Sequence, residues 1–600
     1  MALPPVHVGK LASTFTLAPY VSAEITALNN ALYDTLFPIV TRFCWSAWQH
    51  KLASYNLLPE FGDIPLGLQH GFLVGLERYH LTHTFIPPNH YKSTEHHNFI
   101  QEKYAEELAL GRITQGYPPA VLRSWIGDLR TAPLNVFQQT PGGKLRVTVD
   151  HSFPRSETTV DLTSIAEPTY VSHYIPFDPR YTSVNTVIDA KKFQCTWGTF
   201  SQCYLMVADA PPGTQASIFD VDAAFRNIPT HPSARPFLAV SLNGKIHLDN
   251  CLNFGASPCP GIWGRVADAM VRIFEKEGLD PLIKWVDDFA FFRYPIRREM
   301  DGSWTYRYDE RRIWEIAEPL GWPWAPKKHV PFASTFVYIG FLWDLTEKTV
   351  SLPEPKRVKY QLKLAQWSAS FCATVTEVES LIGTLNHICL ITPEGRGHLQ
   401  GLYKLHASFN QSRNRWVRHS IPSAALDNIA WWRARLSVPS ITMEVIRPPP
   451  PSDDLIYVDA STDWGIGLLI NNRWLAWKLK PGWRSDGRDI GWAEMVAVEV
   501  ALRTLVSLNR QREHFVIHSD NQGVVHSIRA GTSRGIQQNA ILRHIVSLIQ
   551  SHSLWLTTEW VSTNNNPADC ISRGAPPSVS KQIHPRPQIP SHLVHYLSYV

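Results

Sequence analysis

Three acidic residues in the first two thirds of the 600-residue chain lie where apolar runs end or are interrupted. Asp220 ends the run 217–219, and Asp287 and Asp288 interrupt the run 282–292. Two apolar strands flanking an Asp-Asp turn would place both acids at the tip of a hairpin, beside a strand that ends in Asp220. Neighbouring carboxylates in an apolar setting repel one another, and a divalent cation removes that cost. The pattern predicts a cluster that binds Mg²⁺, with two ions roughly 4 Å apart for phosphoryl transfer.

A second group of acids comes after residue 450. Each member lies at the predicted end or start of a strand or helix, which is how an α/β sheet gathers ligands at one rim. Two divalent ions in such a cluster would activate water for phosphodiester hydrolysis. The four members are Asp459, Glu494, Asp520 and Asp569.

Other acids near these groups serve as contrasts. Asp222 is expected to be solvated or to begin a helix. Glu499 is on the same predicted helix as Glu494 and is expected to be solvated. Glu494 itself could be a charge favoured by the helix dipole, and Asp520 could be a cap.

Composition limits the class of protein. The chain is 44% hydrophobic and 18% charged, with a formal net charge of +5, which is typical of a globular protein and permits nucleic-acid binding without demonstrating it. The eight cysteines form no CxxC pair, which argues against a zinc ribbon or a disulfide framework. We see no signal peptide and no apolar run long enough for a membrane span, so we expect an intracellular protein, cytoplasmic and/or nuclear.

The pattern of elements predicts several domains. Arg447 is followed by four prolines, which cannot continue a helix or a central strand. We expect a helical N-terminal region of unknown role, either a small domain of its own or an extension packed on the neighbouring α/β part. The predicted segments are 1–100 (N-terminal region), 101–350 (first α/β part), 351–445 (helical), 446–452 (proline linker), 453–575 (second α/β part) and 576–600 (peripheral tail). Residues 351 to about 436 are expected to be mainly helical, with Leu364, Leu381, Leu385 and Leu402 among the buried positions, and the second α/β part is expected to follow the order strand, strand, helix, strand, helix, strand.

The order and spacing of motifs in the first part resemble the palm of retroelement reverse transcriptases. The box Trp285-Val286-Asp287-Asp288 is similar to the Tyr-x-Asp-Asp box of that family. The other motifs that carry the resemblance are Asp220–Phe225, Phe254–Pro260, Leu320-Gly321 with Lys327-Lys328, and Tyr338–Phe341, which is similar to the primer grip.

The resemblance implies an α+β right-hand polymerase with fingers, palm and thumb, in which Asp220 and Asp287 ligate metal and Asp288 supports them. It implies that Phe225 is the steric gate that excludes a ribose 2′-hydroxyl. The basic residues of the fingers strand, Lys144 and Arg146, would hold the incoming triphosphate. The remaining residues that it assigns to substrate binding are Phe254, Gly255 and Lys328.

Departures from the family pattern leave these metal ligands intact. Trp285 replaces the usual Tyr, and the second motif lacks the commoner Leu and Ala. An insertion near residues 295–311 separates the Asp-Asp hairpin from the helix after it.

The second acidic group resembles the RNase H family, in the order Asp, Glu, Asp, Asp. The ending Asn566-Pro567-Ala568-Asp569-Cys570-Ile571-Ser572-Arg573 is similar to retroelement RNase H. Segments 381–386 and 393–396 resemble DIRS-type (tyrosine-recombinase) elements more than gypsy-type elements. The resemblance implies an RNA-directed DNA polymerase joined through a helical connection to an RNase H-like domain.

The implied cofactor is Mg²⁺, with Mn²⁺ possible and two ions at each active site. The implied partners are an RNA template, a DNA primer, an RNA–DNA hybrid and dNTPs, without a membrane, together with other element-encoded proteins as an open possibility. Two alternatives stay open. The chain could be a non-catalytic, domesticated nucleic-acid-binding scaffold, although all seven acids are present, or a polymerase of ribonucleotides, against which Phe225 argues.

Overall fold

The computed structural model describes residues 31–138, 143–155, 175–411 and 414–600. The chain forms two compact units, which are Met1–Met206 with Ala210–Tyr338, and Val207–Asp209 with Ile339–Val600. The proline segment 446–452 therefore lies inside the second unit and does not separate the two. The finer division into domains stays a prediction.

A four-stranded antiparallel sheet carries the first acidic group. Its order is β13-β6-β10-β9, with β6 at Gln215–Asp220, β9 at Leu282–Trp285, β10 at Asp288–Arg293 and β13 at Val330–Ala333. The middle residues of β6 and β10 are buried, because helix α10 (Cys259–Lys276) packs its apolar face on the same core. The rings of Phe274 on α10 and Phe291 on β10 meet edge to face at 5.0 Å.

The described part of the N-terminal region packs on this same core. Helices α3 (Trp45–Ser54), α4 (Leu58–Phe61) and α5 (Asp63–His70) contribute to it, whereas α6 (Thr94–Ala109) packs in a neighbouring core. Trp48 of α3 is fully buried, and its indole nitrogen donates to the carbonyl of Leu320 at 3.0 Å. Residues 31–100 therefore form an extension packed on the neighbouring α/β part rather than a separate small domain.

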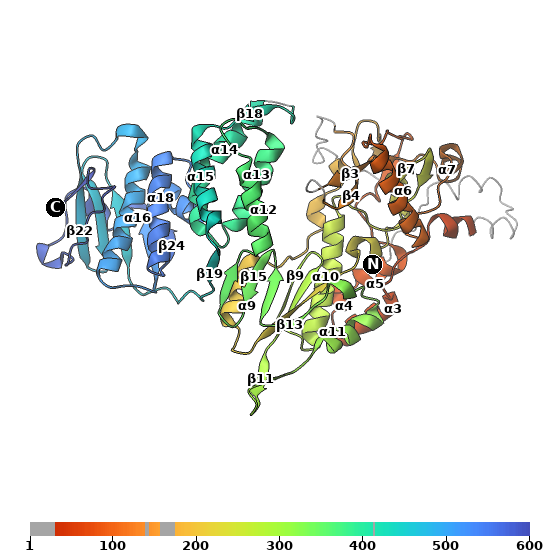
Figure 1. The fold of residues 1–600 in the computed structure, drawn as a ribbon, viewed down its shortest axis with the longest axis horizontal. Helices are drawn as coiled ribbons and strands as arrows, with labels where there is room; N and C mark the ends of the chain where they lie inside the picture. Colours follow the sequence, from red (N-terminus) through yellow and green to blue (C-terminus); the bar gives the residue numbers. More distant parts are fainter. Residues whose placement is uncertain (1–30, 139–142, 156–174, 412–413) are drawn as a thin grey trace. The chain divides into compact units, whose positions relative to one another are not determined.

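Further elements complete the first unit. Strands β3 (Leu134–Gln138) and β4 (Leu145–Val149) form a hairpin, and β2 (Thr131–Ala132), β7 (Ala239–Leu242) and β8 (Lys245–His247) form a small sheet. The predicted insertion is a hairpin of β11 (Pro295–Arg298) and β12 (Trp304–Tyr306), which projects away from the four-stranded sheet (Figure 1). Helix α11 (Glu310–Ala317) comes after it.

The first half of the second unit is mainly helical, as the sequence predicts for residues 351–436. Thr374 and Glu377 form a capping box at the start of the second of these helices, which fixes where it begins. The predicted core residues Leu364, Leu381, Leu385 and Leu402 are all buried. The helices are α12 (Glu354–Ala365), α13 (Val375–Ile388), α14 (Gln400–Ala407) and α15 (Ser423–Ser437).

A six-stranded mixed sheet forms the rest of this unit, in the order β24-β23-β20-β21-β22-β25. Strands β20, β23 and β24 run parallel, and β20, β21, β22 and β25 alternate in direction. Helices α16 and α18 lie side by side against this sheet (Figure 1). The bounds are β20 Ile456–Ala460, β21 Gly465–Ile470, β22 Arg473–Leu479, α16 Ile490–Ser507, β23 His514–Ser519, α17 Gln522–Ala530, α18 Ile536–Ser551, β24 Trp555–Trp560, α19 Asp569–Ser572 and β25 Leu597–Tyr599.

The prediction that residues 576–600 form a peripheral tail is wrong. Strand β25 pairs with β22 and becomes the edge of the six-stranded sheet. Ile583, Leu593 and Leu597 are buried in the same core as the sheet and α16. Strand β25 has only three residues, which are too few for an alternating pattern to show in the sequence.

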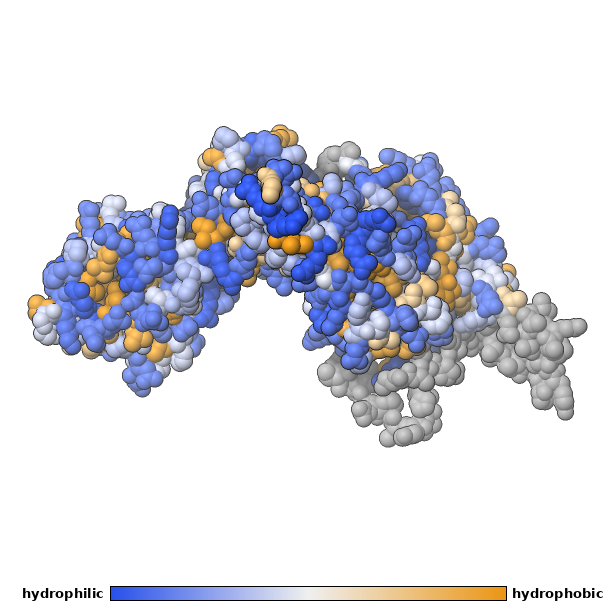
Figure 2. Space-filling view, turned by 90° about the horizontal axis from the view of Figure 1, so that it is seen from below, coloured by the Kyte–Doolittle hydropathy of each residue, from blue (hydrophilic) through white to orange (hydrophobic). Residues whose placement is uncertain are grey.

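Hydrophobic residues are scattered among hydrophilic ones on the face shown in Figure 2. The exposed large hydrophobic side chains come from many different elements rather than from one. Among the residues that the structure describes, no helix combines the length and the apolar character that crossing a membrane requires.

Candidate active sites

The first acidic group forms a single cluster at one end of β6 and β10. Asp220 is the last residue of β6, and the strand register places it directly opposite Asp288, the first residue of β10. Residues directly opposite on antiparallel strands point to the same face, with Cα atoms roughly 5 Å apart. Asp287 lies in the turn between β9 and β10, and its carbonyl accepts a hydrogen bond of 2.9 Å from the amide of Val221. The three acids that the sequence predicted to meet do meet.

The turn that carries Asp287 has an unusual backbone. Val286 adopts a φ of +51°, a left-handed conformation that is rare for a β-branched residue. The indole nitrogen of Trp263 on α10 donates to the Val286 carbonyl at 2.9 Å and so holds the turn in place. Strained backbone of this kind persists where the surrounding structure fixes it, and it is concentrated at functional sites. Trp263 is 22 residues before Trp285 in the sequence, and the motifs alone do not point to this role.

Electrostatics at this cluster favour a cation. Burial, together with Asp220 and Asp288, raises the pKa of Asp287 to about 6. Burial, and then Asp220, raise the pKa of Asp288 as well. Asp287 Oδ1 is buried and has no hydrogen-bond partner among the described residues. Such an atom is costly unless something binds it.

The two lysines of the predicted Gly…Lys motif differ in their contacts. Lys328 Nζ lies 2.7 Å from Asp220 Oδ1, whereas no ion pair of Lys327 occurs among the described residues. Lys328 is the residue that the sequence predicted for substrate binding. Asp222, predicted to be solvated, has a side chain 52% exposed and lies 3.5 Å from Arg42. It is therefore outside the cluster, as expected.

Phe225 lies in the short 3-10 helix η2 (Ala224–Asn227) that comes after β6, and it is buried. Its ring meets the ring of Phe254 edge to face at 5.1 Å. Phe254 is 57% exposed, so it covers Phe225 on one side and faces solvent on the other. The two predicted substrate-binding aromatics therefore form one pair, contributed by two separate motifs.

Gly255 brings the Phe254–Pro260 motif against strand β4. With φ +111°, an added Cβ would lie 2.0 Å from the carbonyl oxygen of Val149 on β4, which only glycine tolerates. Lys144 precedes β4 and Arg146 is on it; both are exposed, and alternate residues of a strand share a face. Among the described residues, no ion pair engages either cation.

One residue that the sequence did not single out holds this motif. Asn185 Nδ2 donates to the carbonyl of Gly255 at 2.7 Å, and Asn185 Oδ1 accepts from the amide of Ser257 at 2.9 Å. A single asparagine in an unremarkable stretch gives no signal for this in one sequence.

Three of the four acids in the second group lie close together, and Asp569 lies apart from them. Asp459 is on β20, Glu494 is in the first turns of α16, and Asp520 comes directly after β23. One carboxylate oxygen of each lies within 4.8 Å of the other two. The parallel pairing of β20 and β23 brings Asp459 and Asp520 to the same rim of the sheet.

Burial makes these carboxylates costly to ionise without a cation. Glu494 is 4% exposed, and burial followed by Asp459 and Asp520 raises its pKa well above the ordinary value. Burial also raises the pKa of Asp459, against the hydrogen bond that Ser572 donates to it. Glu494 Oε2 is buried and has no hydrogen-bond partner among the described residues.

Asp569 does not join this triad in the structure. It begins α19, and Arg573 lies 2.9 Å from its carboxylate. It is near enough for its charge to raise the pKa of Asp459. Its own neighbours support the triad, because Asn566 donates to the Val458 carbonyl at 3.0 Å and Ser572 donates to Asp459.

The expectation for Glu499 is wrong. This residue is fully buried rather than solvated, and its carboxylate forms an ion pair with Arg503 at 2.7 Å and lies 3.0 Å from the imidazole of His592. The expectation failed because the covering residue, His592, comes from the C-terminal segment, which was predicted to be peripheral.

Both clusters fit divalent cations. Each supplies carboxylate oxygens only, which are the ligands that Mg²⁺ prefers. Each also contains one buried carboxylate oxygen without a partner among the described residues, on Asp287 and on Glu494. Asp220, Asp287 and Asp288 could hold ions in the first unit, and Asp459, Glu494 and Asp520, with Asp569 nearby, could hold them in the second.

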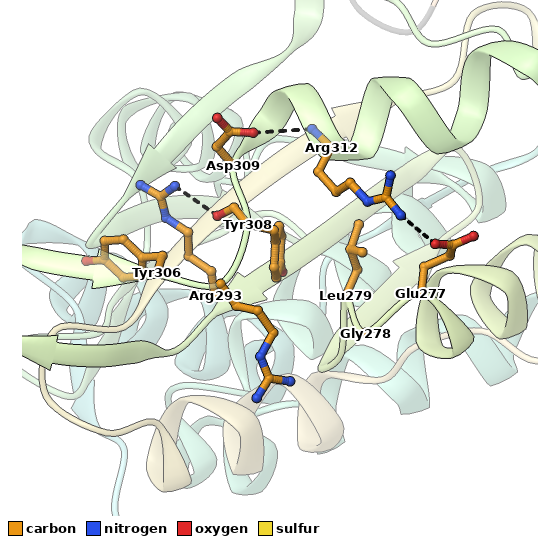
Figure 3. A pocket seen from close by; sticks show the side chains of 9 residues that line it. Glu277, Gly278, Leu279, Arg293, Tyr306, Tyr308, Asp309 and Arg312 are labelled. Carbon is orange, nitrogen blue, oxygen red and sulfur yellow. Dashed lines mark hydrogen bonds and ion pairs between the residues drawn. The ribbon is translucent and has the colours of Figure 1, made fainter.

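An open pocket of about 450 Å³ lies elsewhere in the first unit, and none of the seven acids lines it (Figure 3). Two of the arginines that line it already have partners. Arg312 lies 2.6 Å from Glu277, and Arg293 donates to the Tyr308 carbonyl at 3.3 Å and to Gln215 at 2.6 Å. The pocket is therefore a poor candidate for either chemistry.

Comparisons with known proteins add a structural likeness. No protein-family model and no curated protein matches the sequence. The foamy viral protease-reverse transcriptase dRH in complex with ds DNA aligns at 12% identity and a TM-score of 0.43, over 93% of this chain and 82% of that one. The foamy viral protease-reverse transcriptase in complex with RNA/DNA hybrid aligns at 13% identity and a TM-score of 0.43, over 98% of this chain and 66% of that one. In complex with dsDNA it aligns at 13% identity and a TM-score of 0.42, over 94% of this chain and 98% of that one. Neither the identities nor the TM-scores assign this chain to a family.

Proposed function

We propose that the protein is an RNA-directed DNA polymerase with RNase H activity, which copies retroelement RNA into DNA and degrades the RNA of the resulting hybrid. One observation carries the proposal: Asp220 lies opposite Asp288 on neighbouring strands, with Asp287 in the adjoining turn and one of its carboxylate oxygens unpartnered among the described residues. Divalent ions at such a cluster supply activation of a primer 3′-hydroxyl and stabilisation of the leaving pyrophosphate.

The side chains around this cluster have separate roles in the proposal. Asp220 and Asp287 hold the ions, and Asp288 supports them. The exposed cations Lys144 and Arg146 bind the triphosphate, and Gly255 sets their strand against the Phe254 loop. The buried Phe225 ring blocks a ribose 2′-hydroxyl, which favours dNTPs over ribonucleotides.

The second cluster supports hybrid cleavage. Asp459, Glu494 and Asp520 gather three carboxylate oxygens within 4.8 Å, and ions held there supply activation of water against the RNA strand. Ser572 and Asn566 orient Asp459 through hydrogen bonds. Asp569 completes the set if its carboxylate leaves Arg573 when ions bind. Binding of template, primer and hybrid would rest on backbone and shape, so it should be salt-sensitive.

Origin from a DIRS-type element is part of the proposal and rests on segments 381–386 and 393–396 alone. Directly after the second segment, the Gly397 carbonyl accepts a hydrogen bond from Asn539, and Gln400 donates to the carbonyls of residues 533 and 534. This region of the second unit therefore also has a structural role.

The test is Mg²⁺-dependent dNTP incorporation on a primed poly-rA template. We expect incorporation by the wild-type protein and none by Asp287→Asn, which removes a charge without changing size. Asp222→Asn is the matched control, because Asp222 is two residues from Asp220 but exposed and outside the cluster. Template binding without incorporation by the wild-type protein would instead support the non-catalytic scaffold.

A further inference from the structure

Three potential metal ligands from separate stretches of the chain meet in the second unit, apart from the two acidic clusters. Glu499 is on α16, His544 is on α18, and His592 is in the C-terminal segment between α19 and β25. One ligand atom of each lies within 4.8 Å of the other two. None of the sequence motifs described above includes them.

The carboxylate of Glu499 is the fixed member of this group. It is 0% exposed, and a buried charge requires compensation. Arg503, one helical turn further along α16, donates to Oε1 at 2.8 Å and so orients the group. Oε2 faces His592 Nε2 at 3.1 Å. His592 Nε2 also lies 3.0 Å from Oε1, so both carboxylate oxygens face the imidazole while Arg503 orients the group from outside. Outer partners of this kind commonly hold metal-binding carboxylates.

The two imidazoles lie face to face. Their centroids are 3.6 Å apart, and the ring planes differ by 11°. Two protonated imidazoles in this arrangement would repel each other, so at least one is neutral and offers a nitrogen lone pair. Burial, and then the neighbouring His592, lower the pKa of His544.

We propose that Glu499, His544 and His592 form a binding site for a single Zn²⁺-class transition-metal ion. Two imidazole nitrogens and one carboxylate are a ligand set that suits Zn²⁺, with a fourth position for water, whereas Mg²⁺ prefers an all-oxygen set. The lone pairs lie in the ring planes, so one ring turns out of the stack on binding. His592 has a side chain 25% exposed, which leaves it room to turn.

Within the second unit, the site would link the C-terminal segment to helices α16 and α18. His592 lies five residues before β25, the edge strand that pairs with β22. An ion that joins it to α16 and α18 ties three stretches together, and it stabilises the folded form because the unfolded chain lacks the preformed site. The ion would therefore be structural and separate from the hydrolytic cluster.

The test uses the full-length protein, dialysed against Zn²⁺ in excess Mg²⁺, with bound zinc measured by elemental analysis and affinity by titration. We expect His592→Ala, and separately His544→Ala, to lose one bound Zn²⁺ per chain, with affinity at that site weakened by at least about 10-fold. His595→Ala is the matched control: His595 is exposed, three residues from His592, and outside the cluster, so its zinc content should equal that of the wild type. Any zinc bound at the two acidic clusters should be the same in the wild type and in all of these variants, so it cancels in the comparison.

A second measurement separates loss of the site from loss of folding. Zn²⁺ should raise the unfolding temperature of the wild type and slow proteolysis of residues 576–600, and His592→Gln, which retains a polar side chain, should show neither effect while keeping the wild-type circular dichroism. Equal zinc content in wild type and both histidine variants would overturn the proposal. So would a folded wild type that binds no zinc beyond that held by His592→Gln.

Discussion

Lys328 Nζ and Asp220 Oδ1, from residues 108 positions apart, form an ion pair of 2.7 Å at the end of β6. The lysine neutralises Asp220, one of the three clustered acids. Burial and the neighbouring acids raise the pKa of Asp287, and the charge of Lys328 partly opposes that rise. It leaves Asp287 Oδ1 without a partner among the described residues. The cluster therefore has the Lys328 ammonium group at Asp220 and, within the part of the chain that the structure describes, an unpaired acceptor at Asp287 Oδ1.

Removing that cation should shift the acid limb of the pH profile. In Lys328→Ala the pKa of Asp287 rises above its value of about 6, because a nearby positive charge is lost. Protons then compete with Mg²⁺ up to a higher pH. We expect the pH of half-maximal primer extension in limiting Mg²⁺ to rise by about half a unit, since the side chain of Lys328 is largely exposed and its charge is screened. Lys327→Ala is the control, and an equal shift in both variants would rule out the specific pair.

Truncation of the buried aromatic should change sugar selection. In Phe225→Ala the ring that packs on Phe254 is lost, so a ribose 2′-hydroxyl no longer meets it. We expect the preference for dNTPs over ribonucleotides to fall by at least about 10-fold in primer extension. Unchanged dNTP preference in an otherwise active variant would refute the assignment of Phe225 as the gate.

Neutralising Glu494 should separate the two activities. Glu494→Gln removes a ligand at the second cluster only, so we expect hybrid cleavage to fall by roughly 100-fold or more while primer extension persists. Asp486→Asn, at an exposed residue of the same unit, is the control. Parallel loss of both activities would show instead that the substitution disturbs the whole fold.

The same substitution has a consequence for stability. The pKa of Glu494 is raised in the folded protein, so the folded state binds more protons than the unfolded state above the ordinary value of 4.5. The free energy of unfolding of the metal-free wild type should therefore decline as pH rises from that value. Glu494→Gln cannot titrate, and its free energy of unfolding should decline less, as measured by denaturant titrations across that range.

The C-terminal segment should contribute to stability in proportion to its burial. Leu593 is fully buried with the core of the six-stranded sheet, so Leu593→Ala should lower the free energy of unfolding by about 2–4 kcal/mol. Val594 is 44% exposed, and Val594→Ala should change it by less than ~0.5 kcal/mol. Similar losses in both variants would contradict the observed packing.

The sequence predicted the acids at the ends of apolar strands because that pattern is local: Asp220, Asp287, Asp459 and Asp520 each adjoin a run with strand character. It also predicted the mainly helical region and its buried leucines, where spacing follows the helical period. These signals need no knowledge of distant partners.

What the sequence could not predict depends on distant contacts. The burial of Glu499 comes from Arg503 and His592, 93 residues from Glu499 in the second case. The missed strand β22 is Arg473–Leu479, whose apolar run lacks the alternation of a half-buried strand. Asp569 pairs with Arg573 instead of joining the other three acids, and no sequence pattern indicates which of these neighbouring charges it will contact.

The pairing of β6 with β10 also limits how this chain can change length. A shift of one residue in that pairing would turn Asp288 to the opposite face of the sheet, so insertions or deletions within the β9–β10 turn or either strand would separate the acids. The β11–β12 hairpin begins after Arg293, beyond the last paired residue of β10, and there the chain has room to grow or shrink. Related sequences should therefore vary in length at residues 295–306 and keep constant length from 282 to 293.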